Sequence, residues 1–261
     1  MRPIRRGASP ITTDFTDYKK AKPYLVSRIG SGWFETIHIA SYCSYCERPI
    51  PTNLAVEHLQ PKGLEVEHIK PYAHLEGKWE NFLLGCVNCN SSKSDKDVVI
   101  SEMLLPDRDN TFIAYKYTED GKVKIADNLT NSPVIKEKAI TTLALVGLDK
   151  KLAQCLDENS RAIALERVTQ RKNAWLTALS VKADIENEPT SEGVKRGAIR
   201  TALAVGFFSI WMTVFISDVA MRNRLIDAFA GTRTSGCFDP VTTLPVSPAP
   251  NPDALPDGGK L

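Results

Sequence analysis

The sequence predicts an α+β protein, with short strands and loops in its first half and helices in its second. Two Cys-x-x-Cys pairs enclose a stretch rich in proline, asparagine and serine, which is typical of short strands and loops held by a metal ion. A hairpin pattern follows near residues 112–125. From residue 132 onward apolar residues recur at helical spacing, so the second half is expected to be mainly helical.

Length and composition fit one large folded domain or two small ones. The 261 residues are 43% hydrophobic and 25% charged, close to average usage, so a packed core is expected. The net charge of +2 is too small to indicate nucleic-acid binding by itself. We divide the chain into an arm over residues 1–40, a metal-held domain over 41–131, a helical region over 132–238, and a proline-rich, poorly ordered tail over 239–261.

Turn and helix-start residues place the elements after residue 98. Two apolar runs flank the turn-forming stretch Glu119–Lys122, which predicts a hairpin. Its first strand is expected to include Phe112, Ile113, Tyr115 and Tyr117. Ser132-Pro133 predicts a helix start, because proline in the first turn loses no hydrogen bond. That helix ends near Gly147, and later helices are predicted over residues 152–185, 192–216 and 218–230.

Basic residues are frequent in the arm, where Pro3 and Pro10 oppose a helix and predict an extended chain. Charges of this kind usually lie on a solvated surface. The alternative is contact with backbone phosphates or with a partner. The basic residues concerned are Arg2, Arg5, Arg6, Lys19, Lys20, Lys22 and Arg28.

The stretch 198–216 is apolar and almost long enough to span a bilayer, but it contains Arg200 and several hydroxyl residues. We therefore expect a buried or partner-facing helix. The basic residues at the start are not followed by the apolar region of a secretory leader, which predicts a cytoplasmic protein. In that compartment thiols stay reduced, so paired cysteines favour metal or redox chemistry over disulfides.

The two cysteine pairs, Cys43-x-x-Cys46 and Cys86-x-x-Cys89, predict a structural zinc site. Each tight turn directs two sulfurs at one ion, and two turns complete a closed tetrahedral shell with no open position for catalysis. A redox motif would require one pair in a βαβ context, which the pattern lacks. Cys155 and Cys237 stand alone and are expected to be ordinary buried thiols.

Between the cysteine pairs lie two near-copies of one phrase, at Leu54–Pro61 and at Leu64–Pro71. Each is interpreted as an apolar strand that ends at its proline and carries an adjacent acid and histidine, Glu57-His58 or Glu67-His68. Neighbours on a strand point to opposite faces, so the carboxylate can hold a metal while the histidine reaches a water. The polar residues that follow in order are Asn81, Asn90 and Lys93.

From Cys43 to about Lys96 this order resembles the HNH endonuclease superfamily, whose ββα-metal unit is a hairpin followed by a helix, often with two zinc knuckles. The resemblance implies an N-terminal zinc-bound ββα-metal nuclease unit followed by the helical region. It implies that the acid and Asn90 hold a catalytic Mg²⁺ or Mn²⁺, that the histidine activates water, and that Asn81 orients the histidine loop. Phosphodiester hydrolysis uses such groups, because a hard cation stabilises phosphate charge and a histidine accepts the water proton.

The resemblance leaves two candidates for two of these roles. The carboxylate ligand is Glu57 or Glu67, and the general base is His58 or His68. The first phrase continues with Pro-Lys, as in many family members from phage-defence loci, whereas the second continues with Pro-Tyr, so the first is favoured. The other histidine is expected in a surface or substrate loop. The remaining histidines, expected to be structural or peripheral, are His38 and His74.

Three phrases resemble a narrower group, the PtuB family of HNH proteins from Septu and retron-linked anti-phage systems; they are Cys43–Arg48, Trp79–Leu84 and Gly231–Asp239. This resemblance implies a defence nuclease that acts with a PtuA-like ABC-type ATPase, in retron loci together with a reverse transcriptase and its RNA/DNA. The apolar run Phe207–Ile216 is then a candidate docking surface, although core burial is its simpler explanation. The alternative functions are a zinc-ribbon nucleic-acid-binding module without catalysis and an assembly adaptor.

Overall fold

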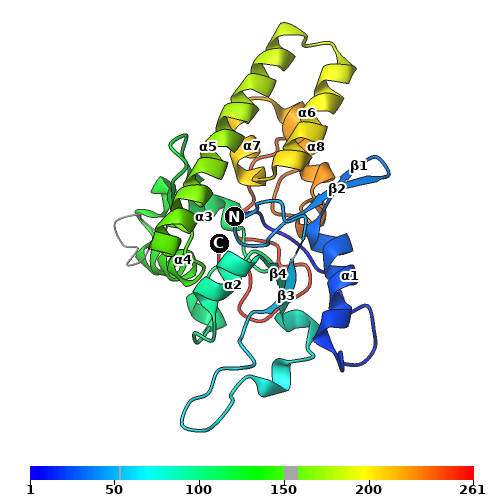
Figure 1. Cartoon of the computed structure of the whole chain (residues 1–261). Coiled ribbons are helices and arrows are strands. Elements are labelled where there is room, and N and C mark those ends of the chain that lie inside the picture. Colours follow the sequence, from blue (N-terminus) through cyan, green and yellow to red (C-terminus); the bar gives the residue numbers. More distant parts are fainter. Residues whose placement is uncertain (53, 150–157) are drawn as a thin grey trace.

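The computed structural model describes residues 1–52, 54–149 and 158–261. In these ranges the named strands pair into three two-stranded antiparallel sheets. In Figure 1 the helices α5 (Glu158–Asn187) and α6 (Glu192–Val205) extend upward side by side from the rest of the molecule. This mixture of helices and small sheets agrees with the predicted α+β class.

The first seventeen residues are irregular in structure, but they are not a free arm. The Arg2 guanidinium donates to the carbonyls of Ile29 and Ala230 at 2.6 Å each, and Arg6 forms an ion pair with Asp107 at 2.7 Å. Both arginine side chains are at most 3% exposed. The expectation of a solvated arm is therefore wrong for these two arginines, because Arg6 is paired with a carboxylate and Arg2 is hydrogen-bonded inside the protein.

Short helical turns and one hairpin complete the first 41 residues. A 3₁₀ turn (Tyr18–Ala21) and α1 (Lys22–Leu25) run into a π-helical turn (Val26–Gly30). β1 (Ser31–Phe34) and β2 (Ile37–Ser41) then pair in antiparallel fashion. The chain passes from this hairpin directly into the first cysteine pair.

A second hairpin and a helix lie at the centre of the first half. β3 (Ala55–His58) and β4 (Phe82–Gly85) pair in antiparallel fashion, and α2 (Val87–Lys93) begins just after β4. Figure 1 shows the three elements next to one another. The order strand, strand, helix agrees with the ββα unit that the resemblance implies.

The predicted hairpin near residues 112–125 is present, with β5 (Tyr115–Tyr117) and β6 (Val123–Ile125) as its strands. Phe112 and Ile113, however, belong to α3 (Thr111–Ala114) and not to the strand. The Ile113 N–H donates to the carbonyl of Asn110, whose side chain is itself bonded to the carbonyls of Cys237 and Val246. Contacts with the distant tail thus favour a helical turn where the local pattern predicts a strand.

The second half is helical, and most predicted helices correspond to observed ones. α4 begins at Pro133 as predicted. The helix predicted over 152–185 corresponds to α5, but its predicted start and Cys155 lie outside the described residues. The helix predicted over 218–230 corresponds to α8. The bounds are α4 (Pro133–Leu145), α5 (Glu158–Asn187), α6 (Glu192–Val205), α7 (Phe208–Val214) and α8 (Val219–Ala228).

The single helix predicted over residues 192–216 is wrong, because the chain breaks between α6 and α7. Gly206 has a φ of +73°, and a Cβ there would lie 2.7 Å from Pro49 Cδ. Phe207 also has a positive φ, and its N–H donates to the Glu47 carbonyl at 3.0 Å. Close contact with the first cysteine turn therefore requires a glycine and ends the helix.

The apolar run Phe207–Ile216 forms core rather than a docking surface. Phe208 and Trp211 are fully buried, and only Ile216 at its end is exposed, at 59%. The docking role considered for this run is therefore wrong, because its large side chains already pack inside the protein. Within the described ranges, the structure contains no helix with the length and apolarity needed to cross a membrane.

The proline-rich tail over residues 239–261 packs onto the first half, contrary to the expectation of poor order. Thr243 is fully buried and Leu261 is 9% exposed. Arg108 donates to the Pro256 carbonyl at 2.9 Å, and the Lys260 N–H donates to Asp109 Oδ1 at 2.9 Å. The tail thus obtains its order from tertiary hydrogen bonds instead of regular secondary structure.

Candidate metal centre and nuclease site

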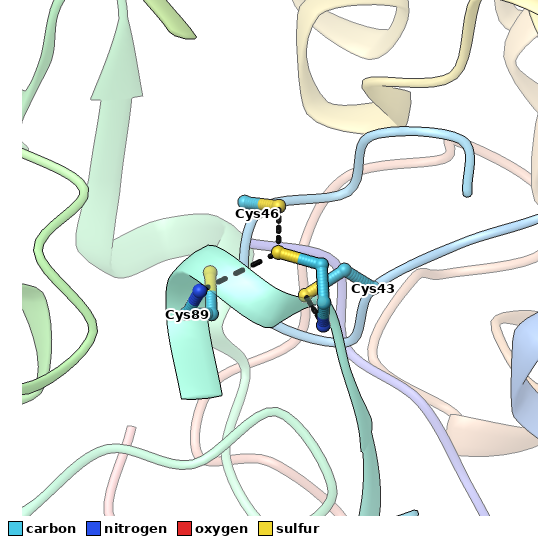
Figure 2. Close-up of side chains that lie close together, drawn as sticks. Cys43, Cys46 and Cys89 are labelled. Carbon is cyan, nitrogen blue, oxygen red and sulfur yellow. Dashed lines mark hydrogen bonds between the residues drawn. The ribbon is translucent and has the colours of Figure 1, made fainter. Parts of the chain in front are cut away.

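Four cysteines from two separate turns converge on one point. Cys43 and Cys46 lie just after β2, and Cys86 and Cys89 lie where β4 passes into α2; Figure 2 shows three of them around this point. Their sulfur atoms lie within 4.8 Å of one another, and each side chain is at most 3% exposed. Tetrahedral Zn²⁺ with bonds of about 2.3 Å separates its sulfurs by about 3.8 Å. The Cys46 and Cys86 sulfurs are 3.7 Å apart, so the cluster fits a structural zinc ion.

Hydrogen-bond donors around the sulfurs suit the negative charge of a four-thiolate zinc site. The N–H of Cys86 donates to Cys43 Sγ at 3.4 Å, and the N–H of Cys89 donates to Cys86 Sγ at 3.5 Å. Arg167, a buried residue of α5, donates from Nη2 to Cys89 Sγ at 3.0 Å. A charge-assisted bond of this kind is stronger than a neutral one. Arg167 therefore links the long helix of the second half to the four-cysteine cluster.

Glu57, the acid of the first phrase, lies inside the unit and not at its surface. It is 1% exposed, and its Oε2 accepts a hydrogen bond from the Tyr45 hydroxyl at 2.6 Å. Its Oε1 lies 2.8 Å from Nζ of Lys93, which is 2% exposed. Burial raises the pKa of the Glu57 carboxyl, and the ammonium of Lys93 opposes that rise. The acid and the lysine thus form a fully buried ion pair.

His58 ends β3 and faces the opposite side of the strand from Glu57. Its ring packs edge-on against Tyr18 and Phe82, with centroids 4.7 and 5.3 Å away. Its Nε2 lies 3.0 Å from the carbonyl oxygen of Glu76. Because a carbonyl can only accept, Nε2 carries the proton of the neutral ring and Nδ1 keeps its lone pair. Burial is the main cause that lowers the pKa of His58, so the ring is neutral at neutral pH.

Asn81 holds the chain that leaves the His58 strand. Its Oδ1 accepts from the Gln60 N–H at 2.8 Å, and its Nδ2 donates to the carbonyls of Gln60 and Leu75 at 3.0 and 3.3 Å. The Asn81 side chain is 4% exposed, so water does not compete with these bonds. It fixes the backbone immediately after His58, which is the kind of contact that an orienting residue makes.

The second acid-histidine phrase forms a surface turn and not a strand. Val66 and Ile69 exchange two backbone hydrogen bonds, of 2.9 and 2.8 Å, and Glu67 and His68 form the tip between them. Both tip residues have positive φ, and the His68 side chain is 99% exposed. The interpretation of this phrase as a strand is therefore wrong. β4 pairs with the first phrase only, and in Figure 1 the connection carrying the second extends away below it.

Asn90 lies on the exposed side of α2, close to the strand that carries Glu57. A Cβ added at Gly85 would lie 3.1 Å from Cβ of Glu57 and 3.8 Å from Cβ of Asn90, so these two side chains flank the glycine. Glu57 Oε1 has no hydrogen bond of good geometry in the described structure. Carboxylate and amide oxygens are ligands that Mg²⁺ and Mn²⁺ prefer. The donor types fit a divalent ion, although Lys93 already occupies one side of the carboxylate.

Three residues of this site received no role from the sequence. Lys93 follows Asn90 by three positions, which places both on one helix face, so a signal for it existed. Tyr45 lies inside the first cysteine pair, where its spacing carries no known meaning. Tyr18 has no local signal, because it reaches His58 only through the fold.

The other residues singled out by the sequence lie apart from the constellation just described. His38 is exposed on β2, with its Nε2 3.1 Å from the Ser41 hydroxyl, and His74 is exposed in a 3₁₀ turn. Cys237 is a buried free thiol, as expected, and burial raises the pKa of its thiol to about 11.

Comparison with known proteins gives one match. Residues 43–96 match the family model described as HNH endonuclease. The matched segment begins at Cys43 and contains all four clustered cysteines, both acid-histidine phrases, Asn81 and Asn90. No curated protein and no solved structure matches the chain. The match therefore supports an HNH nuclease domain in the first half and carries no information about the helices that follow.

Proposed function

We propose that this chain is a metal-dependent endonuclease that hydrolyses phosphodiester bonds of nucleic acid, with His58 as its general base. The observation that carries the proposal is the setting of His58 at the end of a paired strand, within the residues that match the HNH family. Its ring is neutral, and the contact with Glu76 occupies Nε2 and leaves Nδ1 with a lone pair. A base of this kind can accept a proton from water at neutral pH.

The surrounding residues keep the imidazole in one orientation. Tyr18 and Phe82 pack against the ring, and the Glu76 carbonyl holds Nε2. Asn81 holds the backbone that follows His58. Water attack on phosphorus requires the base within hydrogen-bond reach of the water, so a fixed ring lowers the entropy lost on reaction.

Glu57 and Asn90 are the residues proposed to hold Mg²⁺ or Mn²⁺, with Glu67 as the less favoured acid. When bound, such an ion would stabilise the negative charge that develops on the phosphate oxygens. The adjacent Lys93 ammonium means that Glu57 would divide its two oxygens among Tyr45, Lys93 and the ion. The four cysteines are proposed to hold Zn²⁺ for stability alone, because a closed thiolate shell leaves no position for water.

A plasmid-nicking assay with matched histidine variants tests the proposal. We expect His58→Ala to lose about 10²–10⁴-fold in rate, the usual contribution of a general base. His68→Ala is the control, since its side chain is 99% exposed at a turn tip and should cost little. Asn90→Ala should raise the Mg²⁺ concentration needed for cleavage, and EDTA should stop it. Equal zinc content and circular dichroism would show intact folding.

The outcomes separate the rival functions. If His68→Ala is inactive and His58→Ala active, the general base is His68. Full activity in both variants would contradict the HNH mechanism. Nucleic-acid binding by the unmodified chain without any cleavage would favour the non-catalytic zinc-ribbon module.

We further propose that the nuclease acts in the cytoplasm as the effector of an anti-phage system, with a PtuA-like ABC-type ATPase and, in a retron setting, a reverse transcriptase complex. Support comes from the resemblance of Cys43–Arg48, Trp79–Leu84 and Gly231–Asp239 to the PtuB family. Plaque counts on cells that express the chain with such an ATPase test this. Protection by the unmodified chain and none by His58→Ala is expected; equal plaque numbers with and without the chain would contradict the defence role.

A further inference from the structure

A short segment from the start of the chain, Tyr18–Lys22, forms one wall of the proposed active site. It consists of a 3₁₀ turn and the first residue of α1, and both elements pack against β3. The Tyr18 ring lies 4.7 Å from the His58 ring, in an edge-on contact. Tyr18 therefore fixes the segment next to the proposed general base.

The segment carries positive charge that no described carboxylate neutralises. Its three lysine side chains are exposed, and within the described ranges none forms an ion pair. The adjacent acid, Asp17, uses Oδ1 to accept the backbone N–H of Lys19. The lysines are Lys19, Lys20 and Lys22.

A fourth lysine, from another part of the chain, contacts the same segment. Lys62 lies in the connection after β3, and its Nζ is 4.2 Å from the centroid of the Tyr18 ring. Its charge is partly neutralised by an ion pair with Glu76. Tyr18 thus contacts both the imidazole of His58 and the ammonium group of Lys62, and the three unpaired lysines follow it within four residues of the chain.

Exposed lysines are often merely solvated, and these three differ from other unpaired lysines in their place in the fold. Their segment begins at Tyr18, whose ring contacts the residue that must meet a phosphate. A nucleic-acid strand carries one charge at every nucleotide, so phosphates on either side of the reacting one come close to this wall. Lysine binds phosphates as a point charge, and contacts with phosphates carry no sequence information.

We infer that the Tyr18–Lys22 segment binds the phosphodiester backbone of the nucleic-acid substrate, with its three lysines contacting phosphates that flank the one at His58. This inference rests on the proposed nuclease function. The segment lies outside the HNH-matched residues, near the start of the chain. Its task would be to hold the nucleic-acid strand so that the reacting phosphate lies at the general base, His58. The contacts are independent of nucleotide sequence, so they contribute affinity and position.

Salt-dependent binding of the full chain tests the inference. One variant carries Lys19→Gln, Lys20→Gln and Lys22→Gln. A control of equal charge carries glutamine at three lysines of β6, α4 and α5, namely Lys124→Gln, Lys136→Gln and Lys172→Gln. Both are measured by fluorescence anisotropy on labelled duplex DNA and on labelled single-stranded RNA, without added divalent ion. Zinc content confirms folding, and denaturing gels confirm that the probes stay intact.

The expected result is a change in the salt slope. Each phosphate contact contributes about 0.9 to the slope of log K against log salt on duplex DNA and about 0.7 on single strands. Loss of three contacts makes the slope shallower by about 2.7 on the duplex or about 2.1 on the single strand. The control variant should keep the slope of the unmodified chain.

The two hypotheses fail in different ways. If the unmodified chain binds a probe and both triple variants keep the salt slope of the unmodified chain, the inference is wrong while the nuclease proposal stands. If the two triple variants lose slope equally, binding depends on overall charge and the segment has no special role. If the unmodified chain binds neither probe at any salt concentration, the proposed substrate class itself is wrong.

Discussion

Lys93→Met removes the ammonium that faces the buried Glu57 carboxylate. The two groups are 2.8 Å apart and at most 2% exposed, and methionine keeps most of the side-chain length, so the change mainly removes charge. Breaking a buried ion pair by deleting one partner costs about 3–5 kcal/mol, because the remaining charge is left without compensation. A folded domain has only about 5–15 kcal/mol of stability, so a large part of it should disappear.

Urea unfolding followed by tryptophan fluorescence measures this change. Lys96→Met is the control, since it removes one exposed lysine just beyond the same helix and should change the unfolding free energy by less than about 0.5 kcal/mol. Adding Glu57→Gln to Lys93→Met should restore part of the loss, because the double variant no longer buries an unpaired charge. Glutamine can still accept the Tyr45 hydroxyl bond.

The loss should also depend on pH. Burial raises the pKa of Glu57, and without Lys93 less opposes that rise. A carboxyl whose pKa is higher in the folded than in the unfolded state favours folding at low pH, and this contribution falls as pH rises above about 4.3, the ordinary value for glutamate. The deficit of Lys93→Met should therefore be smaller at acidic than at neutral pH. Equal stability of Lys93→Met and the unmodified chain at neutral pH would refute the buried pair as a stabilising contact.

Two further predictions concern the four-cysteine cluster and the contact of Tyr18 with His58. Cys86→Ser should lose the zinc ion and unfold the first half, since one of four ligands is gone. The control Cys237→Ser should keep the zinc ion, and elemental analysis distinguishes the two variants. A Cys86→Ser protein that is folded but free of zinc would contradict a structural role for the ion. Tyr18→Ala should lower kcat, because the His58 ring loses its edge-on neighbour. Tyr18→Phe should retain activity, because the contact uses the ring. Equal kcat values for the alanine and phenylalanine variants would show that Tyr18 does not position His58.

The parts of the site that follow from the sequence are those set by short-range spacing. Two Cys-x-x-Cys turns can direct four sulfurs at one point whatever lies between them, and the four cysteines do converge. The helix start at Pro133 likewise depends on local chemistry alone. Of the two acid-histidine phrases only the first pairs with β4, whereas the choice between them as the catalytic pair stays a prediction.

The features that local pattern did not predict depend on contacts between distant residues. Two similar phrases gave a strand at Glu57-His58 and a turn at Glu67-His68, because β4 pairs with only the first of them. The break at Gly206 arises where α6 meets the first cysteine turn. The burial of Glu57 was missed for the same reason, since its partners Tyr45 and Lys93 come from two other elements.

The packed tail sets an order of events during synthesis. Arg108 donates to the carbonyl of Glu80, the residue before Asn81, and also to the carbonyl of Pro256. Chains fold from the N-terminal side as they leave the ribosome, so the hairpin and helix around His58 emerge long before residue 256. For most of its synthesis the growing chain therefore lacks one support of the Asn81 turn. The contact of Arg108 with Pro256, next to the turn that precedes Asn81, can therefore form only after the rest of the site has been synthesised.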